Sequence, residues 1–353
     1  MQDADRKESG SKRVYKFPNT RTLSTGILGV GSCLPQRRVT NNELAQYVET
    51  TDEWIRDRVG IQSRHIASKD ESTVQLAVEA SKNAIEQAGI TPQDIELIIF
   101  ATITPTQHLP SCSALLQGEL GAGPCLAFDL QAACSGFLFA LQTAESLQRT
   151  QNLKYALIVG AENLTRVVDW SDRSTCVLFG DGAGAVVTSF TDEKPNILAS
   201  ELHTDGSLSH LIERPGEAYP ESTLPKELRD EPVNEKSQYM LMRGREVYKV
   251  AVHCMASTIN TVLERAGHSL DEVDLFVPHQ SNMRMLDAVC ERIQLKDRDK
   301  MVTNINVVGN TSAASIPIAL DYAFKQGRLK KGDLVLLTAV GSGMTYGSML
   351  LRW

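Results

Sequence analysis

The chain has 353 residues, of which 42% are hydrophobic and 22% charged, and it carries a formal net charge of −7. This length and mixture are typical of a globular protein with two lobes or sub-domains. The negative charge argues against a general nucleic-acid-binding protein, which needs a basic face, and no apolar run approaches the roughly 20 residues that cross a bilayer, so we expect no membrane insertion.

Residues 1–22 mix acidic and basic side chains and lack the apolar centre of a secretory signal, which predicts a disordered N-terminal tail. The chain has seven cysteines, an odd number with no CxxC pair. This usage is typical of reduced thiols in a cytoplasmic protein rather than of disulfides or a zinc site.

The chain repeats itself. Residues 84–101 (AIEQAGITPQDIELIIFA) align without a gap with residues 262–279 (VLERAGHSLDEVDLFVPH) at an offset of 178, and each reads as a helix end, a glycine stop, an acidic turn and a buried strand. The order continues in two further pairs of segments, 155–161 with 334–340 and 180–190 with 346–353. Repeats in the same order indicate a duplicated architecture.

Strands that alternate with helical stretches predict an α/β protein whose central sheets are mostly parallel and covered by helices. We place the two halves at residues 23–195 and 196–353, with their loops meeting at a shared site. Residues 203–237 contain four prolines and many charges, which predicts an insertion or loop at the rim of a pocket.

Cys134 is the candidate nucleophile. Residues 128–141 (FDLQAACSGFLFAL) predict a strand, a tight turn of small residues and an apolar helix, with Cys134 at the turn. Unpaired backbone N–H groups and the helix dipole favour an anion there, so we expect a lowered thiol pKa. The alternative is a small buried core residue, which is the commoner fate of cysteine.

His279 in VPHQSN and Asn310 in NVVGNTSAAS each follow a predicted strand, and both can donate a hydrogen bond to a thioester oxygen. Taken singly, they read as a strand-end residue and a Gly-Asn turn. The duplication favours a joint site, since it brings the strand ends to one face. The glycine-rich turn 341–347 lacks the lysine of a P-loop, so it either presents a backbone N–H to an oxyanion or forms an ordinary hairpin.

Six motifs occur in one order along the chain: TNNELAQYVETTDEWIRDRVGIQSRHIA (40–67), AACSGF (132–137), DRSTCVLFGDGAGA (172–185), VPHQSNMRML (277–286), GNTSAAS (309–315) and GSGMTYGSMLLRW (341–353). Together they resemble the β-ketoacyl-acyl-carrier-protein synthase III family, which initiates fatty-acid synthesis in bacteria and plastids. The resemblance runs from about residue 25 to residue 353. It implies a thiolase-like fold of two duplicated βαβαβ-type halves in α-β-α-β-α layers.

The resemblance also implies a decarboxylative Claisen condensation of an acyl-CoA primer with malonyl-acyl-carrier protein, through an acyl-cysteine, to give 3-ketoacyl-acyl-carrier protein. The implied triad is Cys134, His279 and Asn310, and the backbone N–H groups of Cys134 and Ser342 form the oxyanion hole. The expected partners are these two substrates and a second copy of the chain in a homodimer. No metal and no other cofactor is implied.

Further residues carry roles that the resemblance implies. Coenzyme A's adenine is expected between Trp54 and Arg173, with Thr50 and Arg58 nearby, because an indole and a guanidinium both stack on a purine. A basic patch is expected to dock the acidic carrier protein, and the alternative for each of its members is a solvated helix face. The residues at the matching positions are Lys249, Arg284 and Arg292.

The chain departs from the family pattern at two places. Ser342 stands in Gly341-Ser342-Gly343 where three glycines are usual, and serine disfavours positive φ although it keeps the backbone N–H. Leu109 stands where many relatives have phenylalanine, at a position that reaches into the partner's acyl pocket. The smaller side chain predicts room for a longer or branched primer.

Two other functions stay open from the sequence. One is a condensing enzyme of the same fold that starts secondary-metabolite synthesis from a different primer or acceptor. The other is a non-catalytic paralogue that only binds the carrier protein, and the intact Cys134, His279 and Asn310 argue against it.

Overall fold

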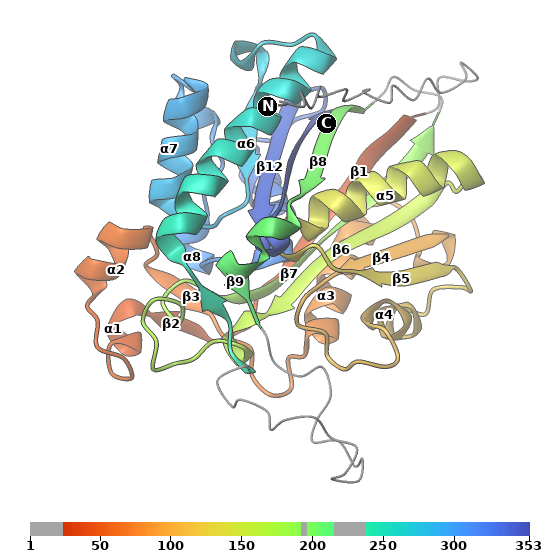
Figure 1. Ribbon diagram of the computed structural model, residues 1–353. Coiled ribbons are helices and arrows are strands. Elements are labelled where there is room, and N and C mark those ends of the chain that lie inside the picture. Colours follow the sequence, from red (N-terminus) through yellow and green to blue (C-terminus); the bar gives the residue numbers. More distant parts are fainter. Residues whose placement is uncertain (1–23, 192–195, 215–237) are drawn as a thin grey trace, which may run out of the picture.

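The computed structural model of the chain describes residues 24–191, 196–214 and 238–353 (Figure 1). The predicted tail, 1–22, lies outside these residues. So does the proline-containing part of the predicted pocket rim, 215–237.

A first sheet is formed by five strands in the order β1-β7-β6-β4-β5. Their bounds are Ser24–Cys33 (β1), Leu97–Ala101 (β4), Leu126–Leu130 (β5), Tyr155–Asn163 (β6) and Asp181–Thr191 (β7). β4 runs parallel to β5 and β6, whereas β7 runs antiparallel to both β6 and β1.

The second sheet repeats this arrangement in the order β11-β12-β13-β8. Its strands are β8 (Ile197–Thr204), β11 (Leu275–Pro278), β12 (Leu334–Gly341) and β13 (Thr345–Arg352). β4, β6, β7 and β1 of the first sheet correspond to β11, β12, β13 and β8 of the second, in the same spatial order. The predicted duplication is therefore present in the fold.

The expectation of mostly parallel sheets is wrong, because both sheets are mixed. Parallel neighbours need a crossover connection, which helices supply between β4, β5 and β6. β12 and β13 are instead joined by the short turn 342–344, so they pair as an antiparallel hairpin.

Helices form three layers around the two sheets (Figure 1). α3 (Thr73–Ala88) and α4 (Cys112–Leu120) pack on the outer face of the first sheet. α5 (Gly136–Gln151) and α9 (Ser315–Lys325) lie between the sheets in a shared apolar core. α6 (Gly244–Ala266) and α7 (Met283–Ile293) cover the second sheet, which completes the predicted α-β-α-β-α order.

The remaining elements are short and lie near the loops that join the layers. They include α1 (Asn41–Leu44), α2 (Asp52–Val59), α8 (Ile305–Val308), β2 (Arg38–Thr40), β3 (Ser63–His65), β9 (Ile212–Glu213), β10 (Leu241–Met242) and the 3₁₀ turns η2 (Ala133–Ser135), η9 (Ser312–Ala314) and η10 (Ser342–Met344). Within the described residues, none of the helices combines the length and apolar character needed to span a lipid bilayer.

The glycine stops read from the two repeated segments are present as expected. α3 begins at a capping box of Ser72 and Gln75 and ends at Gly89 with φ of 68°. α6 ends in the same way at Gly267 with φ of 70°. A left-handed residue closes a helix at low cost only when it has no Cβ, so both glycines fix where the chain turns into the following strand.

Candidate active site

The two halves meet at a pair of equivalent turns. η2 carries Cys134 and leads into α5, and η9 leads into α9 at the matching place in the second half. Each turn begins with a non-glycine residue at positive φ, Ala133 at 46° and Ser312 at 49°. The two turns pack against each other, so the start of α5 faces the start of α9.

The C-terminal hairpin holds the Cys134 turn in place. Thr345 Oγ1 donates to the carbonyl oxygen of Ala132 at 2.8 Å, and Ser135 Oγ donates to the carbonyl oxygen of Thr345 at 3.0 Å. Ser342 has helical dihedral angles. The residue with positive φ in this loop is the next one, Gly343, with φ of 128°. A serine at 342 is therefore compatible with the loop, and its hydroxyl donates to the carbonyl oxygen of Ile212 at 2.5 Å.

Gly341 lets β12 approach this turn closely. A Cβ at residue 341 would lie 2.6 Å from the backbone nitrogen of Cys134. Gly341→Ala is therefore expected to lower the free energy of unfolding by about 1–3 kcal/mol and to slow alkylation of Cys134 by iodoacetamide. Chemical denaturation and peptide mass spectrometry measure the two effects.

Gly118 offers a matched control, since it lies inside α4 and a Cβ there would meet nothing within 4 Å. Gly118→Ala is expected to stabilise the fold by about 0.5–1 kcal/mol and to leave Cys134 unchanged. A Gly341→Ala protein as stable and as readily alkylated as the parent would contradict the close approach.

His279 directly follows β11, which ends at Pro278, and is 1% exposed. Its backbone N–H donates to the carbonyl oxygen of Thr338 at 2.8 Å, which continues the pairing with β12. Its Nδ1 atom has no hydrogen-bond partner among the described residues. Burial lowers the pKa of His279 to about 3, so the imidazole is neutral near pH 7 and has one N–H to donate.

Asn310 is fixed by its backbone and by one side-chain atom. Its N–H donates to the carbonyl oxygen of Leu178, and its own carbonyl oxygen accepts from the N–H of Gly180. Its Oδ1 accepts from the backbone N–H of Ser312 at 2.9 Å. This bond orients the amide so that the NH₂ group is the end left for a ligand.

The triad residues lie around one junction. Asn310 is tied to the first residue of η9, and η9 packs against the Cys134 turn. The residue after His279 is tied to the same region, since the backbone N–H of Gln280 donates to Ser315 Oγ at the start of α9 at 2.7 Å.

The pKa of the Cys134 thiol differs from the value expected from the sequence. Burial raises the pKa of its thiol to about 12, and the Glu162 carboxylate adds to the rise. The Ser312 hydroxyl and a backbone N–H act in the opposite direction but do not offset the loss of water. The expected fall in pKa is therefore wrong, because the turn lies deep between the two halves, although Cys134 itself is partly exposed.

Three polar residues of the site were not predicted from the sequence. Gln280 joins the end of β11 to the chain at Val302–Ile305, and Glu162 and Ser312 flank the cysteine. An acidic residue inside the apolar strand YALIVGAE was the only signal for Glu162. Ser312 looked like one more small residue of a helix start.

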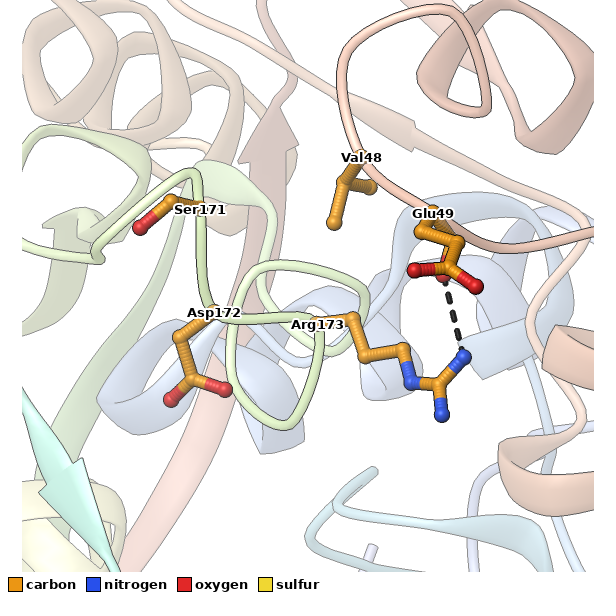
Figure 2. Close-up of a pocket in the computed structure, with 5 residues that line it drawn as sticks. All are labelled: Val48, Glu49, Ser171, Asp172 and Arg173. Atoms are coloured by element: carbon orange, nitrogen blue, oxygen red, sulfur yellow. Dashed lines mark hydrogen bonds between the residues drawn. The ribbon is translucent and has the colours of Figure 1, made fainter.

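A second group of predicted residues lies at the edge of α2. The Arg173 guanidinium stacks directly on the Trp54 ring, with 4.9 Å between the guanidinium carbon and the ring centre. Arg173 also donates to the carbonyl oxygen of Glu49, beside a shallow pocket of about 290 Å³ lined by Val48, Glu49, Ser171, Asp172 and Arg173 (Figure 2). In this arrangement the two side chains touch, so a purine between them requires Arg173 to move.

The other two residues predicted to lie near coenzyme A, Thr50 and Arg58, have different surroundings. Thr50 Oγ1 is buried and has no hydrogen-bond partner among the described residues. Arg58 is exposed on α2, and its carbonyl oxygen accepts from Asn282 near the start of α7 at 3.4 Å. Both therefore lie near the Trp54–Arg173 stack without joining it.

The predicted basic residues lie on the neighbouring helices α6 and α7. Lys249 is exposed on α6, and Arg292 of α7 is exposed and lies 3.2 Å from His253 Nδ1. Arg284 is different, because it forms an ion pair with Asp57 at 2.8 Å and ties α7 to α2. The charge of Arg284 is thus partly neutralised within the chain.

Leu109 lies in the loop between β4 and α4 and is 87% exposed. It is the most exposed of the large hydrophobic side chains that the structure describes. Its side chain therefore makes little contact with the rest of the chain that the structure describes.

Comparison with known proteins places this fold and site in a family. Two family models match the chain, 3-oxoacyl-[acyl-carrier-protein (ACP)] synthase III at residues 128–206 and its C-terminal model at residues 263–353. The β-ketoacyl-[acyl-carrier-protein] synthase III of Erythrobacter litoralis is 47% identical over 334 residues, which cover 94% of this chain and all of that protein. The chain belongs to the 3-oxoacyl-[acyl-carrier-protein] synthase III family. The predicted fold class and acyltransferase activity are thereby confirmed.

Solved structures agree with this synthase assignment. The crystal structure of 3-oxoacyl-[acyl-carrier-protein] synthase III from Aquifex aeolicus matches with a TM-score of 0.85 and 44% identity, over 94% of this chain and all of that one. The priming β-ketosynthase of the R1128 polyketide pathway matches with a TM-score of 0.84 and 34% identity, over 96% and 98% of the two chains.

Proposed function

We propose that this synthase condenses an acyl-CoA primer with malonyl-acyl-carrier protein, using Cys134 as the acyl carrier. The observation that carries the proposal is the meeting of two duplicated turns. One turn carries the thiol of Cys134. The other is tied to the oriented amide of Asn310, and the helix that follows it is tied to Gln280, the residue after the buried His279. Likeness to synthases over nearly the whole chain supports the same reading.

In the first half-reaction, Cys134 Sγ attacks the thioester carbonyl of acyl-CoA. The carbonyl oxygen becomes an oxyanion, which the backbone N–H groups of Cys134 and Ser342 stabilise. The carbon–sulfur bond to coenzyme A then breaks, and the acyl group stays on Cys134. Removal of one such donor typically costs about 10²–10³ in rate.

In the second half-reaction, malonyl-acyl-carrier protein places its thioester oxygen against His279 and Asn310. Neutral His279 donates one N–H and Asn310 donates its NH₂, so negative charge can build on that oxygen as CO₂ leaves. The enolate carbon attacks the acyl-cysteine carbonyl, and the bond to Cys134 Sγ breaks. The product is 3-ketoacyl-acyl-carrier protein, with no metal or redox step.

Coenzyme A is proposed to bind along α2, with its adenine between Trp54 and a displaced Arg173. We expect Thr50 and Arg58, each four residues from Trp54 in the chain, to contribute polar contacts. Arg173→Ala is expected to weaken acyl-CoA binding about 10-fold, the size of a cation–π contact that excludes water. Calorimetric titration measures it, and an unchanged dissociation constant would place the adenine elsewhere.

The acidic carrier protein is proposed to dock on α6 and α7, where Lys249 and Arg292 are exposed, with Arg284 at the edge toward α2.

We propose a homodimer in which Leu109 of each chain, exposed here, enters the acyl pocket of the other. A cytoplasmic location fits the seven cysteines, all of which are free.

A panel of acyl-CoA primers tests the function, with malonyl-CoA and malonyl-acyl-carrier protein as alternative acceptors. We expect 3-ketoacyl-acyl-carrier protein as the product, with longer or branched primers accepted because Leu109 stands where many relatives have a larger side chain. A primer or acceptor restricted to secondary metabolism would favour the second candidate, a starter synthase, which the likeness to the R1128 priming ketosynthase supports. Carrier binding without any product would favour the silent paralogue.

A further inference from the structure

The buried site contains an acidic residue for which the condensation described above has no use. Glu162 is the penultimate residue of β6 and is completely buried, and its carboxylate raises the pKa of the Cys134 thiol. A carboxylate beside a nucleophilic sulfur is unfavourable on electrostatic grounds, since it opposes the thiolate. Its presence therefore needs a reason other than charge stabilisation.

Glu162 is held firmly by neutral donors from the end of β4. Its Oε2 atom accepts from Thr102 Oγ1 at 3.1 Å, from the Ile103 N–H at 3.1 Å and from Thr104 Oγ1 at 2.5 Å. Among the described residues, Oε1 accepts a directed hydrogen bond only from the Ile103 N–H, which it shares with Oε2, at 3.2 Å. A carboxylate accepts about four hydrogen bonds, so this carboxylate has room for another donor.

Ser312 is the candidate for that donor. Its hydroxyl lowers the pKa of both the Cys134 thiol and the Glu162 carboxyl, and its turn packs on the strand that carries Glu162 and on the turn that carries Cys134. Its Oγ is buried and forms no well-directed hydrogen bond to any described residue. A hydroxyl can accept a proton from one neighbour while it donates its own to another, so Ser312 can carry a proton from the thiol to the carboxylate.

The backbone keeps these three residues together. η9, which begins with Ser312, packs on both β6 and the Cys134 turn. β6 passes so close that a Cβ at Gly160, two residues before Glu162, would lie 2.2 Å from the carbonyl oxygen of Ala313. The amide of Asn310 also fixes Ser312 through its backbone N–H.

We propose that Ser312 and Glu162 form a proton relay that takes the proton from the Cys134 thiol during acyl transfer. This rests on the proposed function. The S–H bond breaks as its proton bonds to Ser312 Oγ, and the Ser312 O–H proton bonds to a Glu162 carboxylate oxygen. The sulfur keeps the electron pair and bonds to the acyl carbon. The proton then passes from Glu162 through Ser312 Oγ to the departing coenzyme A sulfur, which leaves Glu162 ionised again.

The pKa values in the site favour a proton path through Glu162 over one through the His279 imidazole. Burial raises the pKa of Glu162 to about 7, while that of His279 falls to about 3. A base works best when its pKa lies near the working pH, so Glu162 is the better proton acceptor. The titratable groups that interact electrostatically with Glu162 among the described residues are Cys134 on η2 and Cys112 on α4.

The test uses two variants, Glu162→Gln and Ser312→Ala, in the full-length protein. Glutamine keeps an oxygen acceptor for Thr102 and Thr104, and alanine is compatible with the positive φ at 312 because Ala133 has it at the equivalent position. Ser81→Ala is the matched control, since Ser81 Oγ is another buried hydroxyl without a partner, in α3.

The readouts are the pH dependence of Cys134 alkylation by iodoacetamide and of its acylation by acetyl-CoA, both followed by peptide mass spectrometry. In the parent, both rates are expected to rise through about pH 7 as Glu162 ionises. Each relay variant is expected to react about 10²-fold more slowly at pH 7.5 and to lose this inflection. The double variant is expected to be no slower than either single one, because the residues act as a unit.

A purely electrostatic Glu162 predicts the opposite sign, since removing its charge would favour the thiolate. Faster alkylation of Glu162→Gln, or unchanged rates in Ser312→Ala, would overturn the relay while leaving condensation intact. The relay pattern in alkylation without any acylation would instead overturn the proposed function. Slowing of Ser81→Ala by the same factor would show that the losses are structural and would also overturn the relay.

Discussion

Cys134→Ala is expected to reduce condensation by at least about 10⁴-fold, because the acyl group then has no nucleophile to carry it. Malonyl-acyl-carrier protein decarboxylation is expected to continue in this variant, since it depends on His279 and Asn310. Radiolabelled CO₂ release and product formation, measured in the same reaction, separate the two steps. Condensation that survives the substitution would remove Cys134 from the mechanism.

Cys290→Ala is the control for loss of a buried thiol. Cys290 is completely buried in α7, away from the paired turns, and packs in the apolar core of the second half. Its truncation is expected to lower stability by about 1–2 kcal/mol and to leave both activities near those of the parent. Equal losses in the two cysteine variants would mean that stability, and not chemistry, explains the Cys134 result.

His279→Ala is expected to slow malonyl decarboxylation by about 10²–10³-fold and to leave acylation of Cys134 largely intact. In the proposed mechanism the imidazole donates to the malonyl thioester and takes no part in the first half-reaction. Single-turnover acylation and CO₂ release are the two measurements. His268→Ala, which changes a partly exposed histidine paired with Glu272 after α6, is the control.

The pH dependence of decarboxylation gives a second check on His279. Burial puts its pKa at about 3, below the ordinary value of 6.5, so the ring stays neutral as pH falls through 6.5. Decarboxylation by the Cys134→Ala protein is therefore expected to show no His279 step between pH 5 and 8. If the charged ring were the donor, the rate would rise as pH falls through this range, and such a rise would contradict a neutral His279.

The sequence predicted the elements that depend on local pattern. The small-residue turn at Cys134 and the glycine stops at Gly89 and Gly267 were read correctly, because turn formers and helix ends leave short-range signals. The duplication predicted that the loops after equivalent strands would meet. That single inference brought His279 and Asn310 toward Cys134.

The features that the sequence did not predict depend on how deeply a residue is buried and on contacts between segments that are far apart in the chain. The expected fall in the Cys134 pKa considered the helix start alone and missed the cost of desolvation between the halves. Glu162 and Ser312 come from different halves, so no spacing in the chain links them. The mixed sheets depended on which connections contain a crossover helix, which strand patterns do not specify.

The acyl-cysteine itself can be observed by incubating the protein with an acyl-CoA alone, digesting it and mapping the acyl group by mass spectrometry. We predict that the acyl group is found on the peptide containing Cys134, and that adding malonyl-acyl-carrier protein before digestion discharges it as 3-ketoacyl-acyl-carrier protein. An unmodified Cys134 while product still forms, or an acyl group on another residue that is discharged instead, would contradict the mechanism.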